Sequence, residues 1–445
     1  PCIALDAGNL DMGQALNKSR DGSAGKTVRD AARMGALRLL AAVDEGATLD
    51  EAATLNERLS PPDRARARRL ALEVLRCTQP ADAVLMPLMA RRPRPDILRI
   101  LRLATVEMLA LGEAPHGAVN AAVALARDLG GKGQAASGMV NAVLRKVSSA
   151  HDIWAGLPAQ RMPDWLRKPV AAQWGEDIAL AIETAHEAGA PLDLTPKGAM
   201  PGDMPGEALP TGSYRLASGT QVSVLPGYEA GDWWVQDAAA AMAVRVLDPQ
   251  PGEQVADLCA APGGKTLQLA AAGAEVTALD ISPSRLGRVA ENLARCGLAA
   301  ELVAGDALDW RPPQPMDAVL LDAPCSATGT IRRHPELPLI RDGAGLAELT
   351  ELQARMIDHA LSILKPGGRM VYATCSLLPA EGEDQLTAAL ARHPGLTVLP
   401  PQAAGIGPDW TTAQGALRLR PDMWPERGGM DGFFIVCLRK SAEQT

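Results

Sequence analysis

Apolar residues recur at three- and four-residue intervals through the first third of the chain, which is the pattern of amphipathic helices. Leu37, Leu40 and Val43 show this spacing. Prolines and the pair Gly130-Gly131 interrupt the pattern between segments, as helix-breaking residues do. The pattern predicts an all-helical region whose helices cover residues 27–43, 63–78, 81–90, 95–110, 117–129 and 135–148.

From residue 234 onward, short apolar runs alternate with segments of helical spacing such as 283–296 and 345–364. This alternation is typical of a sheet built from βαβ units. We therefore predict a doubly wound, Rossmann-like α/β domain, in which ligands bind beyond the carboxyl ends of the strands. The predicted strands cover residues 254–258, 275–279, 300–304, 317–321, 368–374 and 433–438.

The residues between these two regions fit neither pattern. Residues 151–190 have helical spacing, whereas 189–231 are rich in glycine and proline and contain the β-like runs SYRLA (213–217) and QVSVL (221–225). So long a stretch without secondary structure is uncommon inside a compact domain, which favours a small β-containing subdomain. The predicted order is a flexible tail over 1–26, a helical domain over 27–150, a linker and subdomain over 151–233, and a catalytic domain over 234–445.

Charge is distributed unevenly along the chain. The 44 basic and 52 acidic side chains give a net charge of −8, a balance that argues against a nucleic-acid partner. Residues 1–150, however, hold 21 basic and 16 acidic side chains, so residues 151–445 hold the remaining 23 and 36. The arginine clusters RARARR (64–69) and RRPR (91–94) are either solvated helix faces or an RNA-facing patch. In the acidic half, we expect Arg332 and Arg333 to supply a basic path to the catalytic pocket.

Composition excludes several classes of protein. Hydrophobic residues make up 47% and charged residues 22% of the chain, as in ordinary globular proteins. The chain contains no run of about 18 uncharged apolar residues, and its first residues lack the pattern of a secretory signal. The seven cysteines are odd in number and never closer than 29 positions, which argues against zinc and disulfide frameworks. We expect a cytoplasmic protein without a membrane or metal partner.

The first predicted strand of the catalytic half runs into a loop of small residues, CAAPGGK (259–265). Its GGKT ending is that of a phosphate-binding loop, but Cys259 stands where that motif needs a glycine, and the dinucleotide motif GxGxxG is missing too. What remains is a tight turn in which the backbone can approach a ligand. The loop consists of Cys259, Ala260, Ala261, Pro262, Gly263, Gly264 and Lys265.

Aspartates follow successive predicted strands. Asp257 ends the first strand, Asp280 ends the second, and Asp306 follows the third. A single aspartate in such a place is more often a helix cap. Three of them indicate an adenosine-containing ligand, with Asp280 on the ribose hydroxyls and Asp306 near the adenine edge. S-adenosylmethionine fits better than NAD because the phosphate-binding glycines are missing.

Two cysteines, Cys325 and Cys375, each lie just past a predicted strand, in the motifs DAPCS and ATCS. Free cysteines are most often small buried hydrophobes, and a regulatory disulfide is a second alternative. Their position at the ligand-binding edge of the sheet favours chemistry. An amino-methyltransferase would have an aromatic residue where this chain has Cys325.

Two thiols suit the methylation of carbon 5 of a cytosine. Addition of a thiolate to carbon 6 makes carbon 5 nucleophilic enough to attack a methyl sulfonium group. The adduct then loses its carbon 5 proton to a base and expels the thiol. A carboxylic group hydrogen-bonded to ring nitrogen 3 would stabilise the adduct, and Asp322 is placed for it. The target base must leave any stack that it occupies, and these arguments do not say which thiol adds.

The catalytic half resembles the RNA cytosine-5 methyltransferases of the Nop/Sun class. The motifs that carry the resemblance are VQDAAA (235–240), DLCAAPGGKT (257–266), DAPCSATGTIRRHPE (322–336), LKPGGRMVYATCSL (364–377) and MDGFFIVCL (430–438). Residues 30–150 resemble a NusB-like RNA-binding helical bundle, through Pro115-His116, the Val119-Asn120 and Val123 row, and the run NAVLR (141–145). Both together resemble the Sun type, bacterial enzymes that act on small-subunit ribosomal RNA.

The resemblance implies an RNA (cytosine-5-)-methyltransferase with S-adenosylmethionine as cofactor and small-subunit ribosomal RNA as partner. It implies Cys375 as the nucleophile and Cys325 as the residue that assists release. Its cofactor contacts fall on residues 259–265, Asp280, Asp306 and Asp322. We expect a monomer.

The chain departs from the family pattern at positions away from both thiols. Ala327 replaces a usual glycine, Leu337-Pro338 a basic-aromatic pair, Gly382 an asparagine, and LDLTPK (192–197) an Arg-Val-Asn strand. These departures leave the RNA target open. The alternatives are a transfer-RNA methyltransferase, disfavoured by the NusB-like front, a DNA cytosine methyltransferase, disfavoured by the Thr-Cys motif, and a non-catalytic ribosome-assembly or antitermination factor, which would need no two placed thiols.

Overall fold

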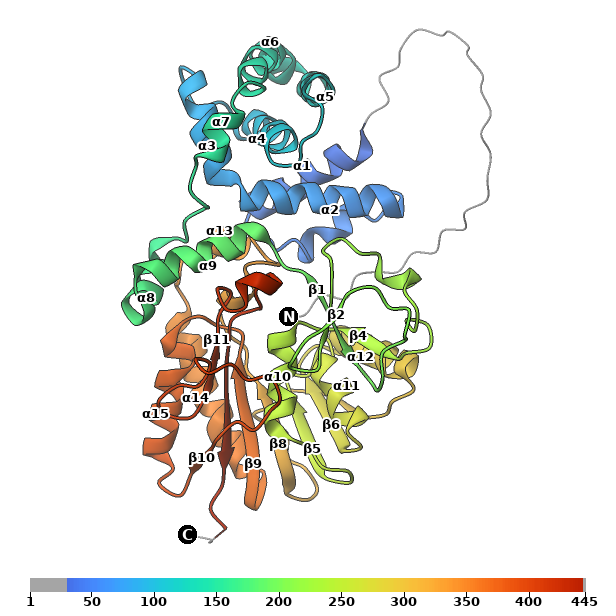
Figure 1. Ribbon diagram of the computed structural model, residues 1–445, viewed down its shortest axis with the longest axis vertical. Coiled ribbons are helices and arrows are strands. Elements are labelled where there is room, and N and C mark those ends of the chain that lie inside the picture. Colours follow the sequence, from blue (N-terminus) through green and yellow to red (C-terminus); the bar gives the residue numbers. More distant parts are fainter. Residues whose placement is uncertain (1–29, 443–445) are drawn as a thin grey trace. The chain divides into compact units, whose positions relative to one another are not determined.

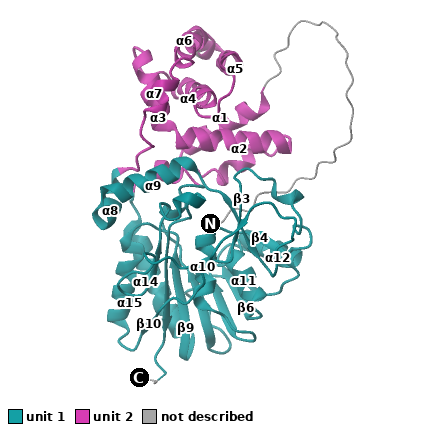
Figure 2. Cartoon of the chain, in the orientation of Figure 1, with its two compact units in different colours: residues 1–7, 164–333, 343–445 teal, residues 8–163, 334–342 magenta. Residues whose placement is uncertain are grey.

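The computed structural model describes residues 30–442, apart from the side chain of Lys132. These residues form two compact units, drawn in different colours in Figure 2. A helical unit comprises residues 30–163 and 334–342, and an α/β unit comprises residues 164–333 and 343–442. The expected tail over 1–26 lies outside the described residues.

The helical unit contains all six helices that the periodicity predicts. Prolines in this unit begin helices as well as separating them: Pro61, Pro95 and Pro115 each occupy a first helical position, where their missing N–H costs nothing. Ser60 caps α2 by accepting a hydrogen bond from Asp63 N at 3.3 Å. The helices before residue 164 are α1 (Ala31–Asp44), α2 (Pro61–Arg76), α3 (Thr78–Leu85), α4 (Pro95–Leu109), α5 (Pro115–Asp128), α6 (Gly131–Val147) and α7 (His151–Ala155).

Helix α4 is the centre of this unit, because it contributes side chains to two apolar clusters. Leu101 lies in one cluster with Leu125 and Leu144, whereas Leu103 lies in the other with Leu40. Burial of one such side chain stabilises the fold by about 1.5–3 kcal/mol. The helix must therefore be apolar almost all around, which its sequence ILRILRLATVEML is.

A short segment of the chain's second half belongs to the helical unit. Residues 334–342 contain helix α13 (Leu337–Ile340). Glu336 is buried and accepts a hydrogen bond from Leu49 N at 3.3 Å, and Ile340 packs against the cluster that holds Leu40. The chain thus enters the helical unit twice.

The α/β unit begins with α8 (Asp164–Trp174) and α9 (Glu176–Ala188), as the helical spacing of 151–190 predicts. An antiparallel sheet of order β2-β3-β1-β4 follows, which confirms a β-containing region between the helices and the large sheet. Leu194, Leu216 and Trp233 form its core. Its strands are β1 (Leu192–Pro196), β2 (Glu207–Ala208), β3 (Tyr214–Leu216) and β4 (Trp233–Val235).

One predicted strand of this region is wrong. The run QVSVL contains a 3₁₀ turn, Val222–Val224, instead of a strand. A strand would place both valines on one face. In the turn, Val222 is buried whereas Val224 is 69% exposed, so only one valine has an apolar partner surface.

The large sheet has the order β10-β12-β9-β8-β5-β6-β7, with β11 paired to β12 (Figure 1). The five strands from β9 to β7 in this order are parallel, whereas β12 pairs antiparallel to β9. This arrangement confirms the doubly wound α/β fold. The strands are β5 (Gln254–Leu258), β6 (Glu275–Asp280), β7 (Glu301–Ala304), β8 (Met316–Asp322), β9 (Leu364–Thr374), β10 (Thr397–Leu399), β11 (Leu417–Leu419) and β12 (Phe433–Arg439).

Helices cover both faces of this sheet. One face carries Val319 and Tyr372 into a cluster with Met356 of α14 and Leu386 of α15. Side chains alternate along a strand, so the strand residues next to Val319 and Tyr372 point to the other face of the sheet. On that face, Thr266 of α11 donates a hydrogen bond to Asp257 of β5. The chain winds from β5 to β6 in one direction and from β8 to β9 in the other, so the strand order reverses between β5 and β8, where ligands bind in such sheets. The helices are α10 (Ala238–Leu247), α11 (Gly264–Ala271), α12 (Pro283–Cys296), α14 (Leu346–Ser362) and α15 (Glu383–Arg392).

Candidate active site

The loop of small residues lies at this switch point, between β5 and α11. Gly263 directly precedes the helix as its N-cap, at φ 104°, a left-handed conformation that favours glycine, and a Cβ there would lie 3.0 Å from Val289. Behind the loop, Thr266 Oγ1 donates to Asp257 Oδ2 at 2.6 Å. Burial raises the pKa of the Asp257 carboxyl group to about 7.

Asp280 closes the same edge of the sheet at the end of β6. Ala261 N donates to Asp280 Oδ2 at 3.2 Å, and Ser282 N donates to its Oδ1 at 2.9 Å. The carboxylate thus fixes the loop to the neighbouring strand. Asp306 follows β7, which pairs with β6, so both aspartates lie beyond adjacent parallel strands. Asp306 is exposed and accepts from Leu308 N at 2.9 Å.

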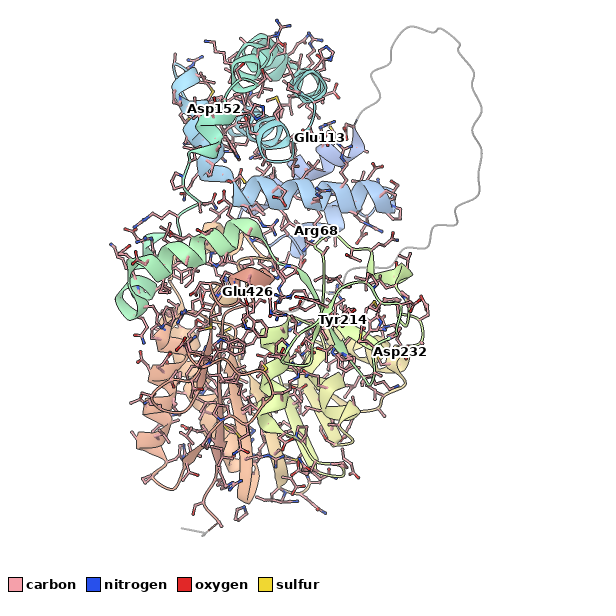
Figure 3. The ribbon with its side chains drawn as sticks, viewed as in Figure 1. Arg68, Glu113, Asp152, Tyr214, Asp232 and Glu426 are labelled. Atoms are coloured by element: carbon pink, nitrogen blue, oxygen red, sulfur yellow. The ribbon has the colours of Figure 1, made fainter. Side chains whose placement is uncertain are left out.

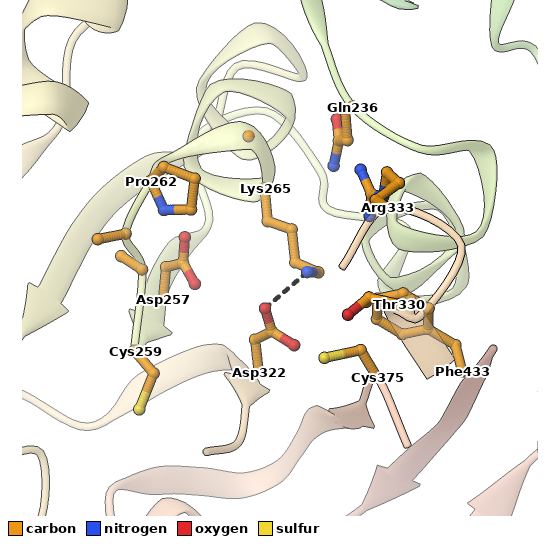
Figure 4. A pocket seen from close by; sticks show the side chains of 13 residues that line it. Gln236, Asp257, Cys259, Pro262, Lys265, Asp322, Thr330, Arg333, Cys375 and Phe433 are labelled. Atoms are coloured by element: carbon orange, nitrogen blue, oxygen red, sulfur yellow. Dashed lines mark hydrogen bonds and ion pairs between the residues drawn. The ribbon is translucent and has the colours of Figure 1, made fainter. Parts of the chain in front are cut away.

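A pocket opens beside this loop and extends to β9 and β12 (Figure 4). In it, Lys265 Nζ lies 2.7 Å from Asp322 Oδ2 and 5.4 Å from the centre of the Phe433 ring. The ammonium group is therefore held between a carboxylate and an aromatic face. The lining residues are Gln236, Asp257, Cys259, Ala260, Ala261, Pro262, Gly264, Lys265, Asp322, Thr330, Arg333, Cys375 and Phe433.

The two cysteines meet at the edge of this pocket. They follow β8 and β9, which pair in parallel register, and Cys325 Sγ lies 3.4 Å from Cys375 Sγ. The hydrogen bond from the Cys325 thiol lowers the pKa of Cys375. The same bond, together with burial, raises the pKa of Cys325 well above its ordinary value. Of the two thiols, Cys375 is thus the one prepared to ionise, and it also lines the pocket.

The structure brings most of the predicted site residues into one place. Cys259 to Pro262, Gly264, Lys265, Asp322 and Cys375 line the pocket, and Cys325 contacts Cys375. Gly263 and Asp280 hold the loop, and Asp306 lies at the neighbouring strand end. Gln236, Thr330 and Phe433 also line the pocket and were not predicted as site residues, although they lie within the motifs over 235–240, 322–336 and 430–438.

The expected basic path is half wrong. Arg332 is fully buried: its guanidinium group lies 3.2 Å from both Asp237 and Asp431 and donates to Gly428 O at 2.7 Å. It therefore serves the fold and cannot meet a ligand. Arg333 does line the pocket, where it pairs with Asp431. Two adjacent arginines in sequence can face opposite surroundings, which composition alone does not reveal.

Arginines of the helical unit are partly engaged in ion pairs. Arg68, labelled in Figure 3, lies 2.7 Å from Asp50, and Arg66 lies 3.8 Å from Glu113. Arg69 and Arg91 are exposed. Surface pairs of this kind contribute about 0–1 kcal/mol each, so they compete weakly with a phosphate. These ion pairs therefore do not prevent the arginines from binding a phosphate group.

The residues present fit the expected S-adenosylmethionine. Asp257 Oδ1 is buried and, within residues 30–442, has no hydrogen-bond partner, so the pocket wall offers a free acceptor to a cationic ligand. The loop of small residues exposes backbone beside it, and Asp280 lies where a ribose would reach. No helix in the described part of the chain is long and apolar enough to cross a membrane.

Comparisons with known proteins extend over both units. The family model described as "16S rRNA methyltransferase RsmB/F" matches residues 244–439, and that of the NusB family matches residues 30–149. The chain is 36% identical to ribosomal RNA small subunit methyltransferase B of Xanthomonas campestris, with 93% of this chain and 98% of that protein covered. It is 35% identical to the protein of the same name in Citrobacter koseri, over 86% of this chain and 92% of that protein.

Solved structures give the same result for the fold. A structure described as PH0851 has a TM-score of 0.69 and 21% identity, and the match covers 93% of this chain and 99% of that chain. A methyltransferase homolog from Pyrococcus horikoshii has a TM-score of 0.51 and 28% identity, over 61% of this chain and 93% of that chain.

Proposed function

Because the chain belongs to the RsmB/F family of S-adenosylmethionine-dependent ribosomal RNA methyltransferases, we propose that it methylates carbon 5 of a cytosine in small-subunit ribosomal RNA. The reaction proceeds through a covalent adduct between Cys375 and the base. The observation that carries this proposal is the contact of 3.4 Å between two thiols with opposite pKa shifts at the edge of the pocket. A binding protein without catalysis would have no use for such a pair.

Cys375 is the nucleophile of the proposed reaction. Its sulfur, ionised by loss of the thiol proton, forms a bond to carbon 6 of the cytosine, and the ring electrons move toward carbon 5. In this step a proton shared between the Asp322 carboxyl group and ring nitrogen 3 moves onto the nitrogen as electron density shifts onto the ring. Lys265 Nζ, 2.7 Å from Asp322 Oδ2, balances the negative charge that this leaves on the carboxyl group. S-adenosylmethionine supplies the methyl group as an electrophilic sulfonium substituent.

Release reverses the addition. A base removes the proton from carbon 5, the ring double bond re-forms, and the bond between carbon 6 and Cys375 Sγ breaks with both electrons on sulfur. Cys325 keeps its proton in this pair because its pKa is raised. Its S–H group therefore donates a hydrogen bond to the departing thiolate, which accounts for its role in release.

The decisive experiment mixes C325A with 16S ribosomal RNA and S-adenosylmethionine and separates the products under denaturing conditions. We expect a protein–RNA adduct to accumulate, because the thiolate loses the donor that stabilises its departure. C375A should give neither adduct nor methylated RNA. The reverse pair of results would contradict the assigned roles.

The substrate needs a separate test. Bisulfite mapping of ribosomal RNA from a deletion strain should reveal one unmethylated cytosine that a plasmid-borne copy of the gene restores. An unchanged ribosomal map together with a lost methyl group in transfer RNA would contradict the ribosomal substrate and leave the chemistry intact.

A further inference from the structure

A buried carboxylate beyond the nucleophile joins the two cysteine loops. Glu381 ends the 3₁₀ turn Pro379–Glu381 and is 0% exposed. Its Oε2 accepts hydrogen bonds at 2.5 Å from Ser326 Oγ and from Ser376 Oγ, and its Oε1 accepts from Ser326 N at 2.8 Å. Ser326 directly follows Cys325, and Ser376 directly follows Cys375. One side chain therefore holds the residue next to each thiol.

Further bonds from the same residue reach the other side of each cysteine. Gln353 of α14 donates to Glu381 Oε1 at 3.0 Å and to Pro324 O at 2.9 Å, so the residue before Cys325 is held as well. The backbone oxygen of Glu381 accepts from Thr374 Oγ1 at 3.0 Å, the residue before Cys375. The residues directly before and after each cysteine are therefore hydrogen-bonded to Glu381, in the case of Pro324 through Gln353.

A direct link between the two loops completes this network. Thr328 Oγ1 lies 3.2 Å from both Ser326 Oγ and Ser376 Oγ, and it accepts a hydrogen bond from Leu377 N at 2.9 Å. These hydroxyl groups are almost completely buried. A buried hydrogen-bond network of this kind can fix the distance between two side chains that it does not itself include.

Burial of a carboxylate is costly even when it is fully hydrogen-bonded, and an apolar residue would often stabilise a fold as well. Fold stability is therefore a weak reason for a charge at this position. The charge also bears on the neighbouring thiol. The hydrogen bond to Cys375 and burial raise the pKa of Cys325, and the negative charge of Glu381 acts in the same direction.

We propose that Glu381 is a positioning residue of the methylation reaction, which holds the two cysteine loops so that the Cys325 thiol donates to Cys375 Sγ. This inference rests on the proposed function, because it takes the two thiols as the reacting groups. Glu381 touches neither the base nor the cofactor in this scheme. It acts by holding the two loops, and its charge adds to the effects that keep the proton on Cys325.

The test compares E381Q with E253Q. Glutamine has the size of the native side chain, but it lacks the charge and its amide nitrogen cannot accept hydrogen bonds from the serine hydroxyl groups. Glu253 pairs with Arg369 at 2.7 Å just before β5, at the end of the sheet opposite to the cysteines, and is the matched control. Three quantities are measured: kcat, KM for 16S ribosomal RNA, and the ratio of Cys325 to Cys375 alkylation by iodoacetamide, from peptide masses.

For E381Q we expect kcat to fall about tenfold or more, because misplaced reacting groups lose much of their effective concentration. KM should stay within about twofold, since no RNA contact is removed. The alkylation ratio should rise several-fold, because Cys325 ionises more easily without the adjacent charge. E253Q should match the wild type in all three quantities.

Wild-type kcat and an unchanged alkylation ratio in folded E381Q would overturn the proposal. If E381Q does not fold, the double variant S326A/S376A removes the same hydrogen bonds from the other side and should reproduce the loss of kcat; wild-type kcat in it would be equally decisive. Alkylation needs neither RNA nor cofactor, so its result is separable from the proposed function. Absence of any adduct with C325A would contradict the proposed function and leave the alkylation result standing.

Discussion

Cys325 Sγ lies 3.4 Å from Cys375 Sγ, and the two thiols have opposite pKa shifts. One hydrogen bond has both effects: it stabilises the thiolate that accepts it and opposes ionisation of the thiol that donates it. The pair is therefore polarised before any substrate arrives. This relationship distinguishes two cysteines whose side chains are otherwise chemically identical.

Removal of Cys325 should make Cys375 less reactive. In C325A the thiolate of Cys375 loses its donor, so its pKa rises and a smaller fraction is ionised at neutral pH. We expect the pH at half-maximal alkylation of Cys375 to shift upward, as measured by iodoacetamide labelling and peptide mass spectrometry between pH 6 and 10. C437A, a change at a buried cysteine in β12, is the control. A downward shift in C325A would show that the bond runs in the other direction.

Loss of the ammonium group beside Asp322 should impair chemistry more than binding. In K265M, Asp322 keeps its charge without the partner at 2.7 Å, and charge developing on the base is no longer balanced. We expect single-turnover methyl transfer to slow by about 100-fold. K265R keeps the charge and should lose less. Equal methyl-transfer rates for K265M and the wild type would show that Lys265 does not contribute to the reaction.

The raised pKa of Asp257 predicts a pH-dependent stability. Between the ordinary carboxyl pKa of about 4 and the folded value of about 7, the folded chain holds a proton that the unfolded chain has lost. Stability of the α/β unit therefore falls as pH rises across this range. D257N cannot ionise, so its stability relative to the wild type should improve by on the order of 2–4 kcal/mol from pH 4 to pH 8. Urea unfolding at several pH values measures this, and parallel curves would contradict it.

The exposed arginines of the helical unit should bind RNA through its phosphates. We expect the fourfold variant R66A/R69A/R91A/R92A to bind 16S ribosomal RNA more weakly and with a flatter dependence on salt, because each lost phosphate contact reduces the slope of log K against log salt by about 0.7–0.9. Fluorescence anisotropy from 50 to 300 mM KCl measures both effects. The fourfold variant K168A/R355A/K365A/R392A in the α/β unit removes the same number of positive charges and is the control for net charge. An unchanged slope in the variant R66A/R69A/R91A/R92A would show that these arginines do not contact RNA and are only solvated surface residues.

Sequence patterns predicted the elements of this fold well because their signals are local. Helix α12 covers 283–296 as predicted, and the six predicted strands of the large sheet are all present. The run QVSVL failed because alternation alone cannot tell a strand from a turn that buries one valine. The two thiols and the loop over 259–265 were predicted to lie near one pocket because motifs place them beyond strand ends, and the structure brings them together there.

What sequence could not provide is the surroundings of each side chain. The pattern gave no reason to separate Arg332, which is buried between two aspartates, from Arg333, which faces the pocket. Phe433 looked like one more apolar residue of a strand, yet its ring lies against Lys265. Such contacts join residues far apart in the chain, and only the assembled sheet defines them.

Helix α13 bears on how this protein could be divided or recombined. The chain leaves the α/β unit after Arg333, adds residues 334–342 to the helical unit, and returns at Gly343. A cut after residue 163 would therefore produce a front half that lacks part of its own interior, and a rear half with Glu336 and Leu337 stripped of their burial. Neither unit is formed by one continuous stretch of chain. Any exchange of the helical unit, in the laboratory or over evolution, must therefore move two pieces of chain, residues 30–163 and 334–342, instead of one.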